Sequence, residues 1–377
     1  MLYLDYAATA PIDPEIARGL LERFETHFGN PKSHHGAGRH ARGLLDEARA
    51  ELATMIGAQP GQLLFTGGGT EAMGLAVLGS AGDKPAHIAF SSVEHNASRH
   101  AAGFLRDRLG WTVSEIPVDA LGQVLPEAVE ATITPETRIV SVMMVNNEVG
   151  AINDIAAIAR VVRRVAPRAK LVVDGVQGFA KLPVNVAEMD ADLFAFTAHK
   201  IHGPKGVGAL YARRPEALRP VFQGGGQEAG VRGGTQSAPL AWAFAEAAKR
   251  YVDDRHAMGA KGQAYFNMLR QRVPDLQLVG PEFGADRAST IVSVHLPYLP
   301  SGPLLEGLAQ AGLCCSAGSA CKGTGGDKFS PVLAAMGRDD AGAYLRFSIG
   351  RPTTDDELAK AADIFADVVA DLSEVYR

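Results

Sequence analysis

One stretch of the sequence decides the fold: Phe194-Ala195-Phe196-Thr197-Ala198-His199-Lys200-Ile201-His202-Gly203-Pro204-Lys205-Gly206-Val207-Gly208. The apolar run up to Phe196 predicts a short buried strand, and the glycines and the proline that follow predict a turn. Lys200 therefore lies in a loop beside hydroxyl and imidazole groups. A dry, polar-lined site lowers the pKa of a lysine and makes it a nucleophile. Taken alone, the same residues are also typical of a surface lysine in a glycine-rich turn.

The composition is that of an ordinary globular protein. The chain has 377 residues, of which 46% are hydrophobic and 21% charged, and these values predict one large or two moderate domains with an ample core. A net charge of -5 gives no electrostatic reason to expect nucleic acid or an anionic membrane as a partner. No apolar run approaches the roughly 20 residues of a membrane span.

The first residues and the cysteines indicate the cellular compartment of the protein. The first residues show neither a basic region nor a long apolar run, so we expect no secretory signal. The three cysteines are clustered and odd in number, which favours a reducing cytoplasm over a disulfide framework. They are Cys314, Cys315 and Cys321.

Apolar segments alternate with helical patterns through the first two thirds of the chain. This alternation predicts an α/β fold in which a mostly parallel sheet has helices on both faces. The expected strands are residues 63–66, 88–91, 139–145, 171–173 and 193–196, and helices are expected at 98–109 and 155–165. An earlier helix begins at Asp13-Pro14, with an apolar face formed by Leu20, Leu21, Phe24 and Phe28.

The remaining sequence predicts a second, smaller unit. A helix from residue 239 to about 255 closes a large domain, which we place at residues 15–255. Residues 1–14 and 256–377 then form a small α+β domain, with a strand at 291–294 and helices at 304–311 and 358–375.

Polar residues follow five of the expected strands. They are Thr70, His95, Asn147, Asp174 and Thr197. Ligands of open α/β sheets bind at the carboxyl ends of the strands. In addition, the run from Gly67 to Gly69 between a strand and a helix predicts a phosphate cradle, because bare backbone N–H groups and the helix dipole face the anion. The pattern is neither a Walker motif nor G-x-G-x-x-G, so it does not indicate a nucleotide.

These residue types together suit pyridoxal 5'-phosphate. Lys200 would hold the cofactor covalently, and Asp174 would keep the ring nitrogen protonated so that the ring accepts electrons. The alternative interpretation of Asp174 is a helix cap after a strand. His95 would stack on the ring and shuttle protons. Gln177 and Asn147 would hydrogen-bond the ring oxygen or the substrate.

A set of short motifs, ordered along nearly the whole chain, resembles one family. The sequence is similar to the cysteine desulfurases of the NifS/IscS-like group, within the class V aminotransferase family of fold type I pyridoxal-phosphate enzymes. The motifs are Tyr3–Thr9, Phe28–Pro31, Gly69–Glu71, Glu94-His95, Val145–Gly150, Asp174–Gln177, His199–Gly206, Arg232–Thr235, Gly318–Cys321 and Arg346–Gly350.

The resemblance implies a role for each matching residue. Lys200 carries the cofactor and moves protons, Asp174 pairs with the pyridinium, and His95 stacks on the ring. Gln177 and Asn147 contact the ring. The phosphate is held by Gly69, Thr70, Thr197 and His199, with Thr235 reaching across from the second subunit of a homodimer. Arg346, with Asn147, binds the substrate carboxylate, for which a planar guanidinium is suited.

The resemblance also implies the activity: sulfur is removed from L-cysteine, giving L-alanine and a persulfide on Cys321 for transfer to an acceptor protein. Glycine and serine on both sides of Cys321 indicate a flexible loop, which favours a reactive thiolate over a buried structural thiol, whereas Cys314 and Cys315 are expected to be packing residues. For Arg346 a surface ion pair is the alternative. A selenocysteine lyase, another class V lyase or aminotransferase, and a non-catalytic sulfur-relay platform are the rival functions.

Three features depart from the pattern of the family. Thr197-Ala198 stands where relatives often have Ser-Gly, a change that keeps the hydroxyl, and Gly175-Val176 replaces a pair of other small residues. The chain also ends soon after its last helix. The resemblance implies a longer tail that docks a scaffold protein in IscS-like members, so the sequence leaves open whether such a partner docks here.

Overall fold

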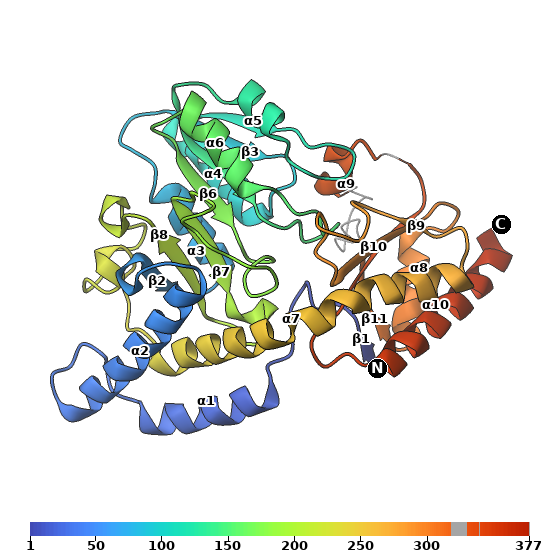
Figure 1. Cartoon of the computed structure of the whole chain (residues 1–377), viewed down its shortest axis with the longest axis horizontal. Coiled ribbons are helices and arrows are strands. Elements are labelled where there is room, and N and C mark those ends of the chain that lie inside the picture. Colours follow the sequence, from blue (N-terminus) through green and yellow to red (C-terminus); the bar gives the residue numbers. More distant parts are fainter. Residues whose placement is uncertain (318–329, 339, 377) are drawn as a thin grey trace.

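The computed structural model describes residues 1–317, 330–338 and 340–376. Its centre is a seven-stranded sheet in the order β2-β8-β7-β6-β5-β3-β4 (Figure 1). Strands β7, β6, β5, β3 and β4 are parallel, while β8 is antiparallel to both of its neighbours. The strands are β2 (Leu63–Thr66), β3 (His87–Ser91), β4 (Thr112–Ile116), β5 (Thr137–Met143), β6 (Lys170–Asp174), β7 (Leu193–Thr197) and β8 (Gly208–Ala212).

Helices cover both faces of this sheet, because its central strands are apolar on both sides. On one face, α3 (Gly69–Leu78) and α4 (Asn96–Leu109) pack in a cluster around Leu75, Phe90 and Leu105. The other face carries a larger cluster around Leu52, Phe196 and Phe244. Its helices are α2 (Gly36–Met55), α5 (Pro126–Thr132), α6 (Ile155–Val165) and the first half of α7 (Ala238–Arg272). The mostly parallel α/β sheet expected from the sequence is thus confirmed.

A second sheet lies beside the first, with its own apolar core around Tyr265, Phe347 and Phe365. Its strands are antiparallel in the order β12-β13-β10-β9. They are β9 (Gln277–Leu278), β10 (Ile291–Leu296), β12 (Ser316–Ala317) and β13 (Ala343–Ser348), with helices α8 (Ser301–Gln310), α9 (Pro331–Ala335) and α10 (Asp355–Tyr376). The first residues of the chain, β1 (Leu2–Tyr3), pair with β11 (Leu313–Cys314).

Helix α7 connects the two units. It is 35 residues long and packs against α2 at one end and α10 at the other (Figure 1). The sequence-based boundary at residue 255 falls inside this continuous helix, so the division at that residue stays a prediction.

The first helix, α1 (Pro14–Thr26), buries less than its sequence indicated. It packs on α7, and Ile16 is its buried residue. Leu21, Phe24 and Phe28 are 64%, 48% and 76% exposed. Because α1 lies outside α2 and α7, only one stripe of it reaches the core (Figure 1), and the expected apolar face is for the most part uncovered.

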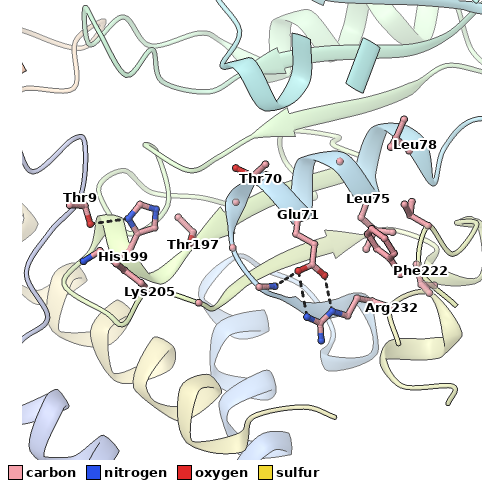
Figure 2. Close-up of a pocket in the computed structure, with 17 residues that line it drawn as sticks. Thr9, Thr70, Glu71, Leu75, Leu78, Thr197, His199, Lys205, Phe222 and Arg232 are labelled. Atoms are coloured by element: carbon pink, nitrogen blue, oxygen red, sulfur yellow. Dashed lines mark hydrogen bonds and ion pairs between the residues drawn. The ribbon is translucent and has the colours of Figure 1, made fainter. Parts of the chain in front are cut away.

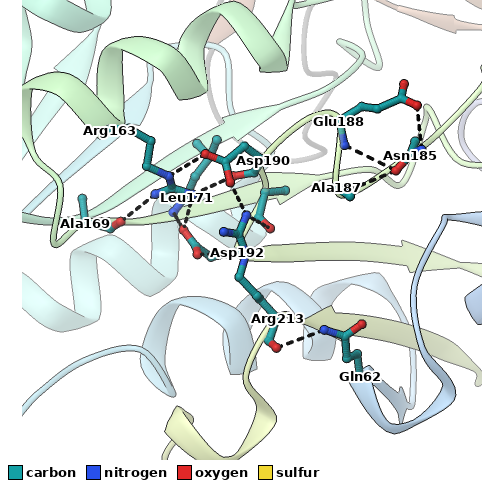
Figure 3. A network of polar contacts seen from close by, with 11 residues as sticks. Gln62, Arg163, Ala169, Leu171, Asn185, Ala187, Glu188, Asp190, Asp192 and Arg213 are labelled. Carbon is teal, nitrogen blue, oxygen red and sulfur yellow. Dashed lines mark hydrogen bonds and ion pairs between the residues drawn. The ribbon is translucent and has the colours of Figure 1, made fainter.

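A network of charged side chains holds the amino ends of β6 and β7 (Figure 3). Asp192 accepts hydrogen bonds from the Leu171 N–H (2.8 Å) and from Arg163 (2.9 Å), and Arg213 lies 3.5 Å from its carboxylate. The Asp192 side chain is 20% exposed, so solvent screens these contacts only in part. The network lies at the edge of the sheet opposite to the carboxyl ends of the strands.

We therefore expect Asp192→Ala to lower the free energy of unfolding by about 1–3 kcal/mol, since a backbone N–H loses its carboxylate acceptor and two arginines keep only Asp190 as an ion-pair partner in this network. Chemical denaturation monitored by circular dichroism measures this change. The matched control is Asp83→Ala, which removes an exposed partner of Arg219 and should leave the midpoint unchanged. Equal losses in the two variants would contradict the assignment.

Candidate active site

Lys200 lies where β7 ends and a single 3-10 turn, η2 (Ala198–Lys200), begins. The chain then reverses through two left-handed residues, His202 and Gly206, into β8. The Lys200 Nζ donates to the carbonyl oxygens of Ala7 (2.7 Å) and Ala8 (2.6 Å). Burial and, next, the positive charge of Arg346 lower the pKa of Lys200 to about 8. The surface-lysine interpretation is wrong, because this amine is enclosed.

A cavity of about 380 Å³ surrounds Lys200, and we call it the lysine cavity. Ten of the residues selected from the sequence line it. They are Gly69, Thr70, His95, Asn147, Asp174, Gln177, Thr197, His199, Lys200 and Arg346. Residues from four strand ends, one helix start and the second sheet thus meet at one point, as expected of the carboxyl edge of a parallel sheet.

Asp174 closes β6 and is buried. Its Oδ1 accepts from the Val176 N–H at 2.9 Å. Burial raises the pKa of Asp174, while this hydrogen bond and the nearby His95 and Lys200 oppose the rise. The next residue is glycine for a steric reason, since a Cβ at Gly175 would stand 2.0 Å from the Phe194 ring. This explains one departure from the family pattern.

His95 is the N-cap of α4, and its Nδ1 accepts from the Ala97 N–H at 3.1 Å. A backbone donor on Nδ1 fixes the tautomer, because the proton of the neutral ring must then reside on Nε2. His95 therefore offers a flat ring and one N–H group at the wall of the lysine cavity.

The start of α3 forms another wall. Gly69 and Thr70 are its first two residues, so free backbone N–H groups face the cavity. The Thr197 hydroxyl donates to the Val207 carbonyl (3.1 Å). His199 Nδ1 lies 3.2 Å from the Thr9 hydroxyl. Burial, followed by Lys200 and other lysines, lowers the pKa of His199 to about 4, so this imidazole is neutral.

A second, larger cavity of about 740 Å³ adjoins this wall, and we call it the outer cavity (Figure 2). It shares Gly69, Thr70, Thr197 and His199 with the lysine cavity. Glu71 accepts from the Gly67 N–H (2.6 Å) and from Arg232 Nε (2.7 Å), which ties the α3 start to the 231–237 segment. The far wall is apolar and consists of Leu75, Leu78, Val221 and Phe222.

Arg346 reaches the lysine cavity from β13 and is 7% exposed. It donates to the Asn147 carbonyl (2.9 Å), to Asp5 Oδ1 (2.7 Å) and to the Ser316 hydroxyl (3.0 Å). The alternative, a surface ion pair, is therefore wrong: Arg346 forms an ion pair with Asp5, but Arg346 is buried. Sequence reasoning missed the part of Asp5, although Asp5 lies inside the matching motif Tyr3–Thr9.

The other residues selected from the sequence are Thr235 and the three cysteines. Thr235 is exposed in the segment between η4 (Glu228–Gly230) and α7. Cys321 lies outside the described residues, so its role remains a prediction. Cys314 and Cys315 are half-buried, and burial raises the pKa of Cys315 to about 12. A thiol with such a pKa stays protonated at neutral pH and is a poor nucleophile.

Two features are absent from the described residues. Among them, no group of three or more histidine, cysteine or acidic side chains is arranged to hold a metal ion. In the same part of the chain, no helix has the length and apolarity needed to cross a membrane.

The lowered pKa of Lys200 predicts how attachment of an aldehyde depends on pH. Only the neutral amine attacks a carbonyl group. The folded-state pKa of about 8 is below the ordinary value of 10.5, so the rate should rise about tenfold per pH unit below pH 8 and level off above it. Attachment of pyridoxal phosphate to cofactor-free protein, followed by absorbance, measures this rate. A rise that continues to pH 10 would show an ordinary lysine.

The fold and the cavity define a class of α/β enzymes that have a lysine at the centre of the site. Comparisons with known proteins indicate the same class. The family model "Aminotransferase class-V" matches residues 2–360. The putative cysteine desulfurase IscS 1 of Bacillus subtilis is 35% identical over 382 residues, covering 99% of both chains. The cysteine desulfurase IscS 1 of Archaeoglobus fulgidus is 33% identical and covers all of both chains.

Solved structures give the same result. A NifS-like protein superposes with a TM-score of 0.90 at 28% identity, covering 98% of this chain and 99% of the other. A structure described as SspA in complex with cysteine has a TM-score of 0.80 at 28% identity and covers 93% and 99% of the two chains. The chain belongs to the class V aminotransferase family.

Proposed function

We propose that the protein is a pyridoxal-phosphate-dependent cysteine desulfurase, which converts L-cysteine to L-alanine and leaves a persulfide on Cys321. One observation carries the proposal: Lys200, Asp174 and Arg346 line the same buried cavity. This set provides a nucleophilic amine, a buried carboxylate and a guanidinium for a carboxylate substrate. The names of the curated relatives support the choice of L-cysteine as substrate.

The residues present fit pyridoxal phosphate. Asp174 is a buried carboxyl whose pKa is raised by burial, so a protonated ring nitrogen beside it would stabilise its anionic form. The N–H groups at the start of α3, with the hydroxyl of Thr70, would hold the phosphate. Thr197 and the neutral His199 would complete this cradle. When bound, the cofactor supplies an electron sink for bond cleavage at the substrate Cα.

The chain's own groups would perform the remaining tasks. Arg346 would fix the substrate carboxylate, and its attachment to Asn147 and Asp5 keeps the guanidinium in place. Lys200, with a pKa near 8, can accept and return a proton at Nζ near neutral pH. His95 can donate from Nε2. The thiolate of Cys321 would take the substrate sulfur, after which an acceptor protein receives it.

Purified protein incubated with L-cysteine tests this function, with alanine and protein-bound persulfide measured together. We expect both products in the presence of pyridoxal phosphate. Alanine without persulfide would indicate a different lyase, and neither product from a protein that holds the cofactor would contradict the proposal.

We also propose a homodimer in which Thr235 contacts the phosphate site of the partner subunit. The apolar wall of the outer cavity supports this arrangement, since Phe222 is 70% exposed beside Val221 and Leu78. Exposed apolar surface of this kind marks an interaction site. A cytoplasmic location and an acceptor protein of unknown identity complete the proposal.

The dimer predicts that Phe222→Asp is a monomer, because a charge placed in an apolar interface loses its hydration. We expect weaker retention of the cofactor in this monomer, as the partner's Thr235 contact is lost. Sedimentation velocity measures the first effect and absorbance after gel filtration the second. Phe104→Asp is the matched control, since Phe104 is 48% exposed on α4 and should leave the dimer intact. A wild-type monomer would contradict the proposal.

A further inference from the structure

Lys181 lies outside the lining of the lysine cavity, and neither the motifs nor the proposed mechanism uses it. It follows Asp174 by seven residues, after a turn in which Ala180 has the left-handed φ of 61°. Its Nζ donates to Gln177 Oε1 at 2.6 Å. Gln177 is 3% exposed and lines the cavity, whereas Lys181 is not among the lining residues.

The hydrogen bonds of Gln177 form a chain into the active site. Its Nε2 donates to the Ala7 carbonyl at 2.9 Å, and the same oxygen accepts from Lys200 Nζ at 2.7 Å. A charged lysine amine donates hydrogen bonds and accepts none. Lys181 therefore binds the amide oxygen only, and this contact decides which end of the Gln177 amide faces the cavity.

The surroundings of Lys181 make a purely packing role unfavourable. Burial and, next, the positive charges of Lys200 and Arg346 lower the pKa of Lys181 to about 7. His199 and His202 are also within its electrostatic reach. A cation among other cations, held by a neutral amide oxygen, gains little for the fold, so a role at the site is the better account.

We propose that Lys181 is a positioning residue that acts through Gln177. By holding Oε1, it fixes the amide so that Nε2 presents one N–H to the Ala7 carbonyl and the other to an anionic oxygen of the bound group. This inference rests on the proposed function, in which that oxygen is the phenolic oxygen of pyridoxal phosphate. Lys181 itself touches neither cofactor nor substrate.

The test is a pH titration of the cofactor absorbance in holoprotein, which needs no turnover. A donor on the ring oxygen disfavours the protonated chromophore, so Lys181→Met, which releases the Gln177 amide, should move the midpoint upward by about one pH unit. Lys181→Gln keeps an N–H donor without the charge and should recover at least half of this shift. Lys249→Met, which loses a partly exposed lysine on α7, is the control and should match wild type.

A double-variant cycle decides whether Lys181 acts through Gln177. In the Gln177→Ala background, adding Lys181→Met should cause almost no further shift. An equal shift in both backgrounds would overturn the inference, because it would mean a direct effect of charge. No shift in Lys181→Met holoprotein would overturn it as well. If Lys181→Met does not fold, Lys181→Gln takes its place in the cycle. A full shift of the absorbance midpoint by Lys181→Gln in both the wild-type and the Gln177→Ala backgrounds would then overturn the inference. Wild-type protein that binds no cofactor would instead contradict the proposed function.

Discussion

Replacing Lys200 by alanine should give a colourless protein that releases alanine from L-cysteine at least about 10⁴-fold more slowly than wild type. The variant loses both the amine that links to the cofactor and the group that moves protons. The surrounding structure should persist, because Nζ contacts the Ala7 and Ala8 carbonyls, which retain a donor in Gln177 or gain water.

Borohydride reduction followed by mass spectrometry measures the covalent link, and an alanine assay measures turnover. Lys249→Ala is the matched control, since its amine pairs with Glu51 and Glu246 on the surface. A Lys200→Ala protein that still carries reducible cofactor on another lysine would contradict the assignment of Lys200.

Replacing Cys321 by alanine should have an effect of similar size on alanine release, with about 10³-fold or more of the rate lost. The thiol is needed when the substrate C–S bond breaks, and not before. The variant should therefore still bind pyridoxal phosphate and still change its absorbance on addition of L-cysteine, while carrying no persulfide. Stopped-flow absorbance and mass spectrometry of the protein separate these steps.

Cys315→Ala is the matched control, because burial keeps that thiol protonated. It should keep most of the activity and lose some stability through packing. If Cys315→Ala lost desulfuration while Cys321→Ala kept it, the nucleophile assignment would be wrong and the cofactor assignment would survive.

The central sheet could be predicted because its strands are nearly continuous apolar runs, such as Ile139–Val145, separated by helical patterns. The sequence could not show where α7 ends, because this helix packs in the apolar cores of both units. Helix α7 continues to Arg272 through a polar stretch that holds Asp253, Asp254, Gly259 and Gly262, where the apolar pattern is interrupted. The exposure of the apolar face of α1 could not be predicted either, because the spacing of apolar residues does not show which element covers a helix.

The site followed from a topological rule, which brings residues at strand ends such as Asn147 and Asp174 to one edge. Groups that enter the site from elsewhere do not obey that rule. The carbonyl oxygens of Ala7 and Ala8 have no signature in sequence, since every residue has a carbonyl. Asp5 and Lys181 are ordinary charged residues until the structure shows that they contact Arg346 and Gln177.

The first residues of the chain have a consequence for the order of assembly. Ala7 and Ala8 reach Lys200 because β1 is paired with β11, and Asp5 reaches Arg346 on β13. A ribosome makes these residues well before their partners on β11 and β13. The nascent chain must therefore keep its leading segment unattached until the strands β11 and β13 have been synthesised. Closure of the lysine cavity by the first residues is, on this account, a late event in the assembly of the fold.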